Sequence, residues 1–450
     1  MGRTWSSRSD PIPAAYGEDV SRDPRAPRRV VVVGAGLAGL RTASELRTQG
    51  FGGHVVVLGA EGVPPYDRPP LSKHLLDVPQ PVWLADDLGT DLADVADAVH
   101  LDDPAERLEV GDGQRPATVT TRSGAVHTAD AVVLACGSHP VRPAGWDGAL
   151  VLHTAADAAA LRSRIAAGAR LVIAGAGWIG AEVATVAAAA GADVTVLEAG
   201  RTPLERQLGP AVGGRFARSY AAAGIDLRLE TPVASATARE AGVRVTAADG
   251  TELDADVALA AVGVRPATAW LTGVVPLTPS GYVAAGPDGA VEGLEDRGVW
   301  AVGDCALRNS TRHGLVPGGH WTAALEDPAR LVRSLLAGWA GGDVGPAPGV
   351  VPPEPAPYVF STQLGHEVAA FGRTSADSRV VLRGEDPQEW TALYLEADAD
   401  LTERLVGVVV VDRPRDVGQA RKLLAQPEPP ALDLARAADP AVPLRSTVLA

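Results

Sequence analysis

The chain has 450 residues, of which 46% are hydrophobic and 21% charged, and its formal net charge is −15. This length exceeds one ordinary hydrophobic core and suggests about three domains. The composition is that of a globular protein, and the negative charge argues against general binding to nucleic acid or anionic membranes. Cys136 and Cys305 are far apart in the sequence and form no CxxC motif. We therefore expect no disulfide framework, metal cluster or paired redox thiol, and a reducing, cytoplasmic setting.

Residues 1–28 are polar and rich in arginine and proline. This composition predicts a disordered tail and not a targeting segment. No run of apolar residues in the chain approaches the roughly 18 needed to cross a bilayer, so we expect no membrane span.

A strand–turn–helix pattern begins at residue 29. The apolar run 30–33 is typical of a strand buried on both faces of a parallel sheet, and it leads directly into the GxGxxG turn 34–39. A helix is predicted over 40–48 and a second strand over 54–58, with Glu61 after it. In such a turn the glycines allow close backbone approach to a pyrophosphate, and the helix N-terminus attracts the negative charge.

The same pattern recurs about 140 residues later. A strand over 170–174 leads into the GxGxxG turn 175–180, a helix over 181–190 and a strand over 193–197, which Glu198 follows. Two such units predict two dinucleotide sites and not a repeat array. Glu198 can accept hydrogen bonds from both ribose hydroxyls and would repel a 2′-phosphate, which favours NADH over NADPH, although Arg201 lies close by.

A stiff, proline-rich arm, PPYDRPPLSKHLL, spans residues 64–76. We expect a helix to begin here with Ser72 as its N-cap. The arm would hold two cations, Arg68 and Lys73, at fixed points. Lysine occurs elsewhere only at position 422 in this arginine-rich chain.

The rest of the chain reads as shorter β patterns, a linker and a last module. Strands are predicted at 117–122, 125–128, 130–137, 243–246, 257–262 and 299–302, the last running into Gly303-Asp304. A glycine- and proline-rich linker is predicted at 338–357. Beyond it, strands at 358–360, 368–371, 380–383, 392–396 and 405–411 and a helix at 416–424 predict a separate α+β module.

Several of these motifs, taken in order, resemble the FAD-dependent NAD(P)H ferredoxin reductase family that serves oxygenase systems. The motifs are Gly34-x-Gly36-x-x-Gly39, Glu61, YDRPPLSK at 66–73, Ala-Cys-Gly at 135–137, the second glycine turn, AVGVRP at 261–266 and Gly303-Asp304. The chain is similar to the putidaredoxin, rubredoxin and biphenyl dioxygenase ferredoxin reductases over roughly residues 29–427. The YDRPPLSK string separates this branch from the disulfide reductases, whose redox cysteine pair is missing here.

The resemblance implies an α/β fold of the glutathione-reductase type, with two Rossmann-like dinucleotide-binding domains and a C-terminal α+β domain. The FAD domain would be discontinuous, over 29–146 and 262–345, and the NAD domain would span 147–261. The C-terminal domain would cover 350–427, and 428–450 would be a tail.

The resemblance also implies roles for individual residues. Lys73 would lie near the flavin ring and pair with Glu182, and Trp321 would set an aromatic ring against the flavin at the electron exit, the alternative being a partly buried core tryptophan. The remaining cofactor residues would be Gly34, Gly36 and Gly39 at the FAD pyrophosphate, Glu61 at its adenosine ribose, Arg68 along the FAD, Asp304 at its ribityl or pyrophosphate region, Gly137 and Gly263 in nearby turns, and Gly175, Gly177, Gly180 and Glu198 at NADH.

One string departs from the family's pattern. Phe360-Ser361-Thr362-Gln363 resembles the family's FWSDQ, with Phe for Trp and Thr for Asp. Cys305 is expected to serve packing. The histidines at 74, 313 and 320 show no metal spacing, so no metal is expected.

The activity implied is hydride transfer from NADH to FAD, followed by delivery of single electrons to an iron–sulfur ferredoxin that feeds a monooxygenase or dioxygenase. A local basic face would receive an acidic ferredoxin, its candidates being Arg308, Arg312, His313, Arg330 and Arg333; the alternative is scattered surface arginine. Two other functions stay open, direct action on a small molecule and a redox sensor whose output is binding. We expect a monomer or homodimer.

Overall fold

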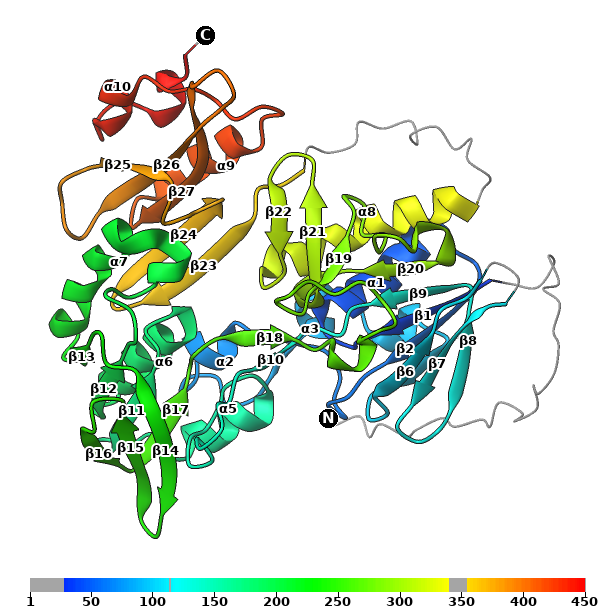
Figure 1. Ribbon diagram of the computed structural model, residues 1–450, viewed down its shortest axis with the longest axis horizontal. Helices are drawn as coiled ribbons and strands as arrows, with labels where there is room; N and C mark the ends of the chain where they lie inside the picture. The colour runs from blue at the N-terminus through cyan, green and yellow to red at the C-terminus, as the bar shows by residue number, and fades with distance from the viewer. Residues whose placement is uncertain (1–27, 113–114, 340–353, 450) are drawn as a thin grey trace.

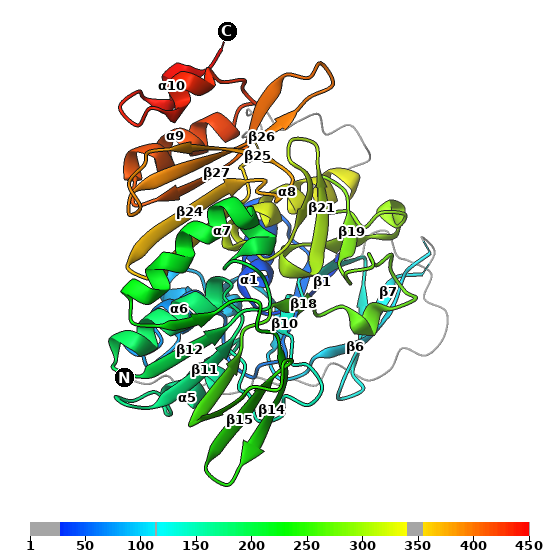
Figure 2. The same cartoon turned by 60° about the vertical axis from the view of Figure 1, so that its left-hand side comes forward.

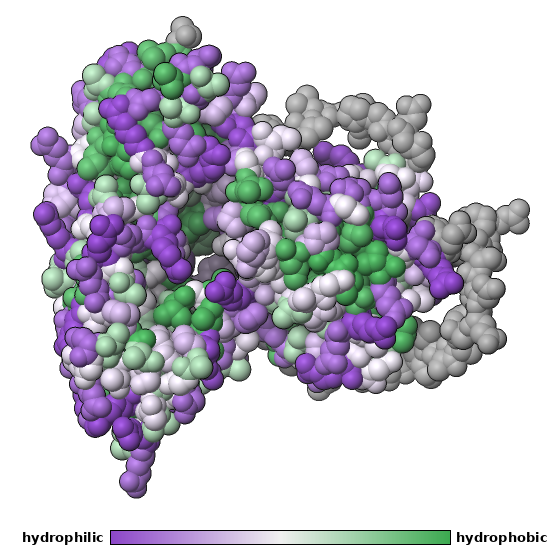
Figure 3. All heavy atoms as spheres, in the orientation of Figure 1, coloured by the Kyte–Doolittle hydropathy of each residue, from purple (hydrophilic) through white to green (hydrophobic). Residues whose placement is uncertain are grey.

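The structure is a computed structural model that describes residues 28–112, 115–339 and 354–449. The predicted tail at 1–28 and linker at 338–357 lie mostly outside these ranges. Two bodies stand side by side (Figure 1). One, made from the beginning and the middle of the chain, carries the first glycine turn, and we call it the first nucleotide domain after the site expected there. The other combines the domain of the second glycine turn, the second nucleotide domain, with the C-terminal domain. Figure 3 shows the surface hollowed where the two bodies face each other.

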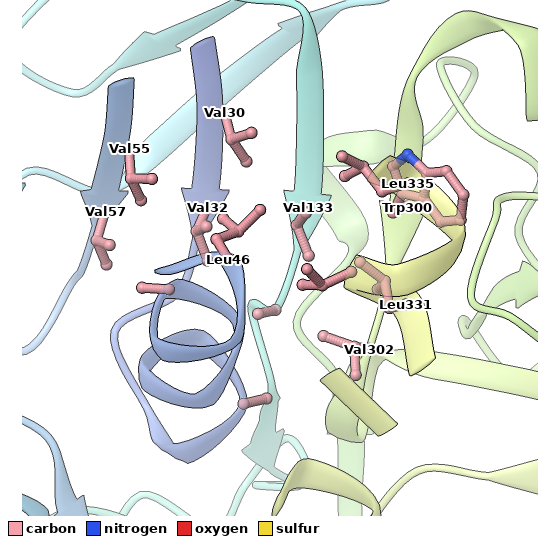
Figure 4. Close-up of a cluster of buried hydrophobic side chains, with 14 of the residues drawn as sticks. Val30, Val32, Leu46, Val55, Val57, Val133, Trp300, Val302, Leu331 and Leu335 are labelled. Atoms are coloured by element: carbon pink, nitrogen blue, oxygen red, sulfur yellow. The ribbon is translucent and has the colours of Figure 1, made fainter. Parts of the chain in front are cut away.

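The first nucleotide domain is built on a five-stranded parallel sheet of order β20-β9-β1-β2-β5. Its strands are β1 (Arg29–Val33), β2 (His54–Leu58), β5 (Ala98–His100), β9 (Ala131–Leu134) and β20 (Val299–Ala301). The strands are apolar on both faces because both faces are covered. One face packs on helices α1 (Leu37–Thr48) and α8 (Trp321–Trp339), as Figure 4 shows for Val32, Leu46 and Leu331. The antiparallel sheet β6 (Ala105–Glu109), β7 (Ala117–Thr121) and β8 (Val126–Ala129) adds to the core on the other face.

The second nucleotide domain repeats this plan on a four-stranded parallel sheet of order β13-β12-β11-β17. The strands are β11 (Arg170–Ala174), β12 (Asp193–Leu197), β13 (Asp226–Arg228) and β17 (Val257–Ala260), and the helices are α5 (Ala155–Arg162), α6 (Trp178–Ala189) and α7 (Glu205–Ala222). An antiparallel sheet of β14 (Val233–Arg239), β15 (Gly242–Ala247) and β16 (Glu252–Ala255) closes the face opposite α6. Two chain segments connect the nucleotide domains, and they pair with each other through the strands β10 (Ser138–Pro140) and β18 (Val264–Pro266).

The C-terminal domain is an antiparallel sheet of order β23-β24-β27-β26-β25. Its strands are β23 (Tyr358–Gln363), β24 (His366–Gly372), β25 (Arg379–Arg383), β26 (Trp390–Ala397) and β27 (Glu403–Val411). Helix α9 (Pro414–Leu424) covers one face, and α7 of the second nucleotide domain packs on the other (Figure 2). The Tyr394 hydroxyl donates to the Leu208 carbonyl at 2.7 Å within that contact. The second nucleotide domain and the C-terminal domain therefore share a core.

The end of the chain differs from the expected tail at 428–450. Helix α10 (Leu434–Ala438) and the 3-10 turn η4 (Leu444–Thr447) pack on the C-terminal domain through buried apolar side chains. Arg383, itself buried, forms an ion pair with Asp416 and donates to the carbonyls of Ala437 at 3.1 Å and Val442 at 2.6 Å. A buried guanidinium needs such partners, and here the last residues supply them.

Smaller elements complete the first nucleotide domain. They are β3 (Tyr66–Asp67), α2 (Pro70–Lys73), β4 (Val82–Trp83), α3 (Leu84–Leu88), α4 (Leu92–Val95), η1 (Ala269–Leu271), β19 (Val283–Ala285), η2 (Glu295–Arg297), η3 (Gly303–Cys305), β21 (Ala306–Ser310) and β22 (Gly314–Pro317). No helix within the described ranges is both long and apolar enough to cross a membrane.

Candidate functional site

The first glycine turn joins β1 to α1 in a conformation that only glycine allows at two of its positions. Gly34 has φ 122°, and a Cβ there would lie 2.0 Å from the Ala135 carbonyl oxygen. A Cβ on Gly39 would lie 1.9 Å from the Gly34 oxygen. A Cβ on Gly36 would meet nothing within 4 Å, so this glycine faces open space. The turn is thus tightly packed at Gly34 and Gly39, its closed side, and open at Gly36, its open side. An open side of this kind lets the backbone come close to a phosphate.

The second turn, between β11 and α6, has the same construction. A Cβ on Gly175 would lie 2.5 Å from the Ala261 oxygen, and one on Gly180 would lie 2.1 Å from the Gly175 oxygen, whereas Gly177 again faces open space. In the described part of the chain no side chain caps the N-terminus of α1 or α6. Both helices can therefore present backbone N–H groups and a partial positive charge to an anion.

The residues assigned to FAD gather at the carboxyl edge of the first sheet. Gly34 follows β1, Glu61 follows β2, Gly137 follows β9 and Asp304 follows β20. Asp304 accepts from the Gly319 N–H at 3.0 Å. Parallel strands place the residues after their carboxyl ends along one crevice, where open α/β sheets bind their ligands.

Arg68 lies beside Glu61. The two side chains form an ion pair, and Arg68 also donates to the His153 carbonyl at 2.5 Å. The Tyr66 hydroxyl donates to Glu61 at 2.6 Å, and burial raises the pKa of that hydroxyl to about 12. The structure thus brings Arg68 to the ribose end of the expected FAD site, and a contact further along the cofactor stays a prediction.

The carboxylate after β12 is held against the second glycine turn. Glu198 accepts from the backbone N–H of Ala176 at 2.6 Å and of Gly200 at 2.7 Å. Arg201, which could have received a 2′-phosphate, instead forms an ion pair with Glu205 at 2.7 Å. Gly263 follows β17 at the same edge of this sheet, with φ 106°.

Lys73 and Glu182 meet where three domains join. The Lys73 ammonium lies 2.5 Å from Glu182 Oε1, and the two side chains are only 11% and 3% exposed. Glu182 also accepts from the hydroxyls of Ser72 and Ser361, each at 2.5 Å. The Phe360 ring lies 4.9 Å from the ammonium, within cation–π range. Phe360, which departs from the family's tryptophan, thus forms one wall of the lysine's surroundings.

The predicted N-cap at Ser72 is wrong. Helix α2 runs from Pro70 to Lys73 with Pro69 as its N-cap, so Ser72 lies inside it. Proline is favoured in the first turn of a helix because it has no N–H to leave unpaired. The helix therefore begins at Pro70, before the position predicted from Ser72. The Ser72 hydroxyl does not cap the helix and instead donates a hydrogen bond to Glu182.

Trp321 begins α8 and is half-buried. Its indole N–H donates to Asp67 at 2.8 Å, and burial raises the pKa of that carboxyl. Asp67 belongs to the YDRPPLSK arm, so the arm fixes both Lys73 and Trp321. That Trp321 touches a flavin stays a prediction.

The two cysteines meet in space despite their distance in the sequence. A hydrogen bond from Cys136 to Cys305, together with burial, raises the pKa of the Cys136 thiol. Both thiols are free, and Cys305 also lies 3.2 Å from the Leu134 carbonyl oxygen. Their separation in the sequence gives no sign of this contact. Among the described residues no group of three or more His, Cys, Asp or Glu side chains could hold a metal ion.

The predicted basic face does not form. Arg308 is buried in ion pairs with Asp327 and Glu354, and Arg312 donates to the Gln426 carbonyl at 2.5 Å. His313 is also buried, which lowers its pKa to about 4. Arg330 pairs with Asp327 at 3.2 Å, and Arg333 is the one candidate of the five that is exposed. Arg308 and Arg312 hold the first nucleotide domain to residues beyond 353.

Comparison with known proteins agrees with this geometry. Residues 28–325 match the family model for pyridine nucleotide-disulphide oxidoreductases, and residues 358–448 match that for the reductase C-terminal domain. The chain belongs to the pyridine nucleotide-disulphide oxidoreductase family. The match to the C-terminal domain extends past 427, in line with the packing of α10 and η4.

Within this family the chain is similar to ferredoxin reductase components. It is 32% identical to rhodocoxin reductase of Rhodococcus erythropolis, over 89% of this chain and 90% of that protein. It is 31% identical to the ferredoxin–NAD(+) reductase component of the anthranilate 1,2-dioxygenase system of Burkholderia cepacia, over 92% and 98%. A solved covalent complex of putidaredoxin reductase with putidaredoxin superposes with a TM-score of 0.80 at 26% identity, covering 94% of this chain and 98% of the other. The resemblance and the fold class inferred from the sequence are confirmed.

Sequence reasoning missed three contributors to this site. Asp67, Ser72 and Ser361 all lie within motifs named above. Their spacing, however, does not indicate that Asp67 accepts a hydrogen bond from Trp321 or that the two serines donate to Glu182. The signal for two of them was their position beside a residue already assigned, Ser72 beside Lys73 and Ser361 beside Phe360.

The open front of the first turn gives a testable prediction. Gly36 has φ −86°, which alanine adopts readily, so Gly36→Ala should leave the thermal stability of the apoprotein unchanged. Its methyl group would stand where a pyrophosphate must approach, so we expect weaker FAD binding in equilibrium titration. Gly39→Ala is the matched contrast, because its methyl group would collide with the Gly34 oxygen and destabilise the apoprotein itself. Equal FAD affinity in Gly36→Ala and the unaltered protein would contradict this account of the turn.

Proposed function

We propose that this protein takes hydride from NADH onto FAD and passes single electrons to an iron–sulfur ferredoxin that serves a monooxygenase or dioxygenase. The observation that carries the proposal is the buried Lys73–Glu182 pair, which joins the first nucleotide domain to the second. A hydride transfer between two bound dinucleotides needs two such domains held in one fixed relation.

The first nucleotide domain fits FAD. The turn of Gly34, Gly36 and Gly39 would hold the pyrophosphate, Glu61 the adenosine ribose, and Gly137 and Asp304 the crevice beyond it. FAD, when bound, supplies the conversion between a hydride and single electrons. Lys73 would bring a fixed positive charge to the site that accumulates electrons, where preorganised charge acts most strongly. Glu182 keeps that ammonium in one position.

The second nucleotide domain fits NADH better than NADPH. Gly175, Gly177 and Gly180 form the turn, and two backbone N–H groups fix Glu198 beside it. There its carboxylate would meet the adenosine ribose of the dinucleotide. A 2′-phosphate there would meet this negative charge, while Arg201 is engaged by Glu205. Like charges brought together at a binding site reject the wrong ligand.

A ferredoxin is the acceptor that the relatives favour, since their names are those of ferredoxin reductases. The exit would lie near Trp321, which Asp67 holds at the start of α8. We expect the protein to act in the cytoplasm as a monomer or homodimer.

The direct test is NADH-dependent reduction of cytochrome c by the FAD-loaded protein, with and without a [2Fe–2S] ferredoxin from an oxygenase system. We expect turnover to depend on the ferredoxin. Turnover that is the same without ferredoxin would overturn the electron-transfer function and favour direct action on a small molecule. Reduction of the flavin without any onward transfer would favour a redox sensor.

The cofactor preference gives a second prediction. The kcat/KM should be higher with NADH than with NADPH. Glu198→Gln should lower the NADH-to-NADPH ratio of kcat/KM about 10-fold, because it removes about 1.4 kcal/mol of repulsion between the carboxylate and the 2′-phosphate. Asp193→Asn, at the exposed start of the same strand, is the control and should leave the ratio unchanged. A higher kcat/KM with NADPH in the unaltered protein would contradict the assignment of Glu198.

A further inference from the structure

Glu182 receives more hydrogen bonds than its partnership with Lys73 requires. Its Oε1 accepts from Lys73 Nζ and from Ser361 Oγ, both at 2.5 Å, and its Oε2 accepts from Ser72 Oγ at 2.5 Å. The ammonium and the two serine hydroxyls thus contact both oxygens of the Glu182 side chain. Asp67 also lies near enough for the Lys73 charge to act on its carboxyl group.

These donors come from separate parts of the chain. Ser72 and Lys73 lie on α2 of the first nucleotide domain, Glu182 lies on α6 of the second, and Ser361 lies on β23 of the C-terminal domain. A carboxylate buried this deeply depends on each partner, because no water replaces a lost one. The C-terminal domain therefore supplies part of the environment that holds Lys73.

Ser361 is held rigidly in position. It is 1% exposed, and its strand pairs with β24 on one side. Just after β23, the backbone N–H of Leu364 donates to Thr185 of α6 at 2.7 Å, so the strand and the helix that carries Glu182 are bonded to each other. The preceding residue, Phe360, faces the Lys73 ammonium. β23 thus contacts both members of the ion pair through adjacent residues.

We propose that Ser361 is a positioning residue for hydride transfer, which fixes the Glu182 carboxylate from the C-terminal domain and through it the Lys73 ammonium. This inference rests on the proposed function, because it assigns Ser361 to the same NADH-to-FAD step. It gives the C-terminal domain a role in flavin reduction, in addition to any role in meeting a partner.

The test compares Ser361→Ala with Ser361→Thr, which keeps the hydroxyl, and with Thr362→Ala. Thr362 is the exposed next residue on the strand, and its hydroxyl contacts Glu367 at 3.0 Å, away from the ion pair. Rapid mixing of the FAD-loaded protein with NADH should show flavin reduction about 10-fold slower in Ser361→Ala, with an unchanged KM for NADH. Ser361→Thr should restore the rate, and Thr362→Ala should match the unaltered protein.

Two further readouts separate positioning from a general loss of structure. The midpoint potential of the bound FAD, measured without NADH or ferredoxin, should become more negative in Ser361→Ala because the nearby cation is less well fixed. If Ser361 acts through Glu182, the variant Ser361→Ala/Glu182→Gln should be no slower than Glu182→Gln alone.

Unchanged potential and unchanged reduction rate in Ser361→Ala would overturn the inference, as would losses that add in the double variant. A fall in thermal stability with unchanged rate and potential would reduce Ser361 to a structural bond and would also overturn it. If NADH fails to reduce the flavin of the unaltered protein, the proposed function fails, and the potential measurement still decides whether Ser361 positions the cation.

Discussion

The buried ion pair between Lys73 and Glu182 is the interaction on which the arrangement of the domains depends. Removing one member of such a pair leaves an uncompensated charge out of water, at a cost of about 3–5 kcal/mol. The protein avoids this cost by bringing α2, α6 and β23 to one point, where Ser72 and Ser361 complete the hydrogen bonds of the carboxylate. If any of the three domains moved away, one of the two charges would lose a partner or become exposed to water.

The two nucleotide domains supply the rest of the site through one repeated device. Each parallel sheet ends in a glycine turn that is closed behind and open in front, and each carries a carboxylate after its second strand. The arm at 64–76 then links the domains: Arg68 lies at Glu61, Asp67 holds Trp321, and Lys73 reaches Glu182. One stiff segment thus places groups at the expected ribose end of the FAD site, at the expected electron exit and at the junction with the second domain.

Much of this could be predicted from the sequence, because the information was local. The apolar run before Gly34, the glycine spacing and the acidic residue after the next strand are short-range patterns, and the structure forms both units as expected. The Lys73–Glu182 pair came from a family resemblance and not from spacing, since the two residues are 109 apart.

What could not be predicted depended on packing between distant segments. Arg308 and Arg312 look like surface charges in an arginine-rich chain, yet they bind Glu354 and the Gln426 carbonyl at a domain junction. The last residues look like a tail, but their apolar side chains and the carbonyls that bind the buried Arg383 fix them to the C-terminal domain. Cys136 and Cys305 meet because β9 and β20 are neighbours in the sheet, which no spacing along the chain reveals.

The central claim is that Lys73 and Glu182 act as one unit in flavin reduction. The most direct measurement is the rate of flavin reduction by NADH in Lys73→Met, in Glu182→Gln and in the double variant, each with FAD bound. We predict that each single variant is slower and that the double variant is no slower than Lys73→Met, because the carboxylate acts only through the ammonium. Unchanged rates in the single variants, or losses that multiply in the double variant, would contradict the account.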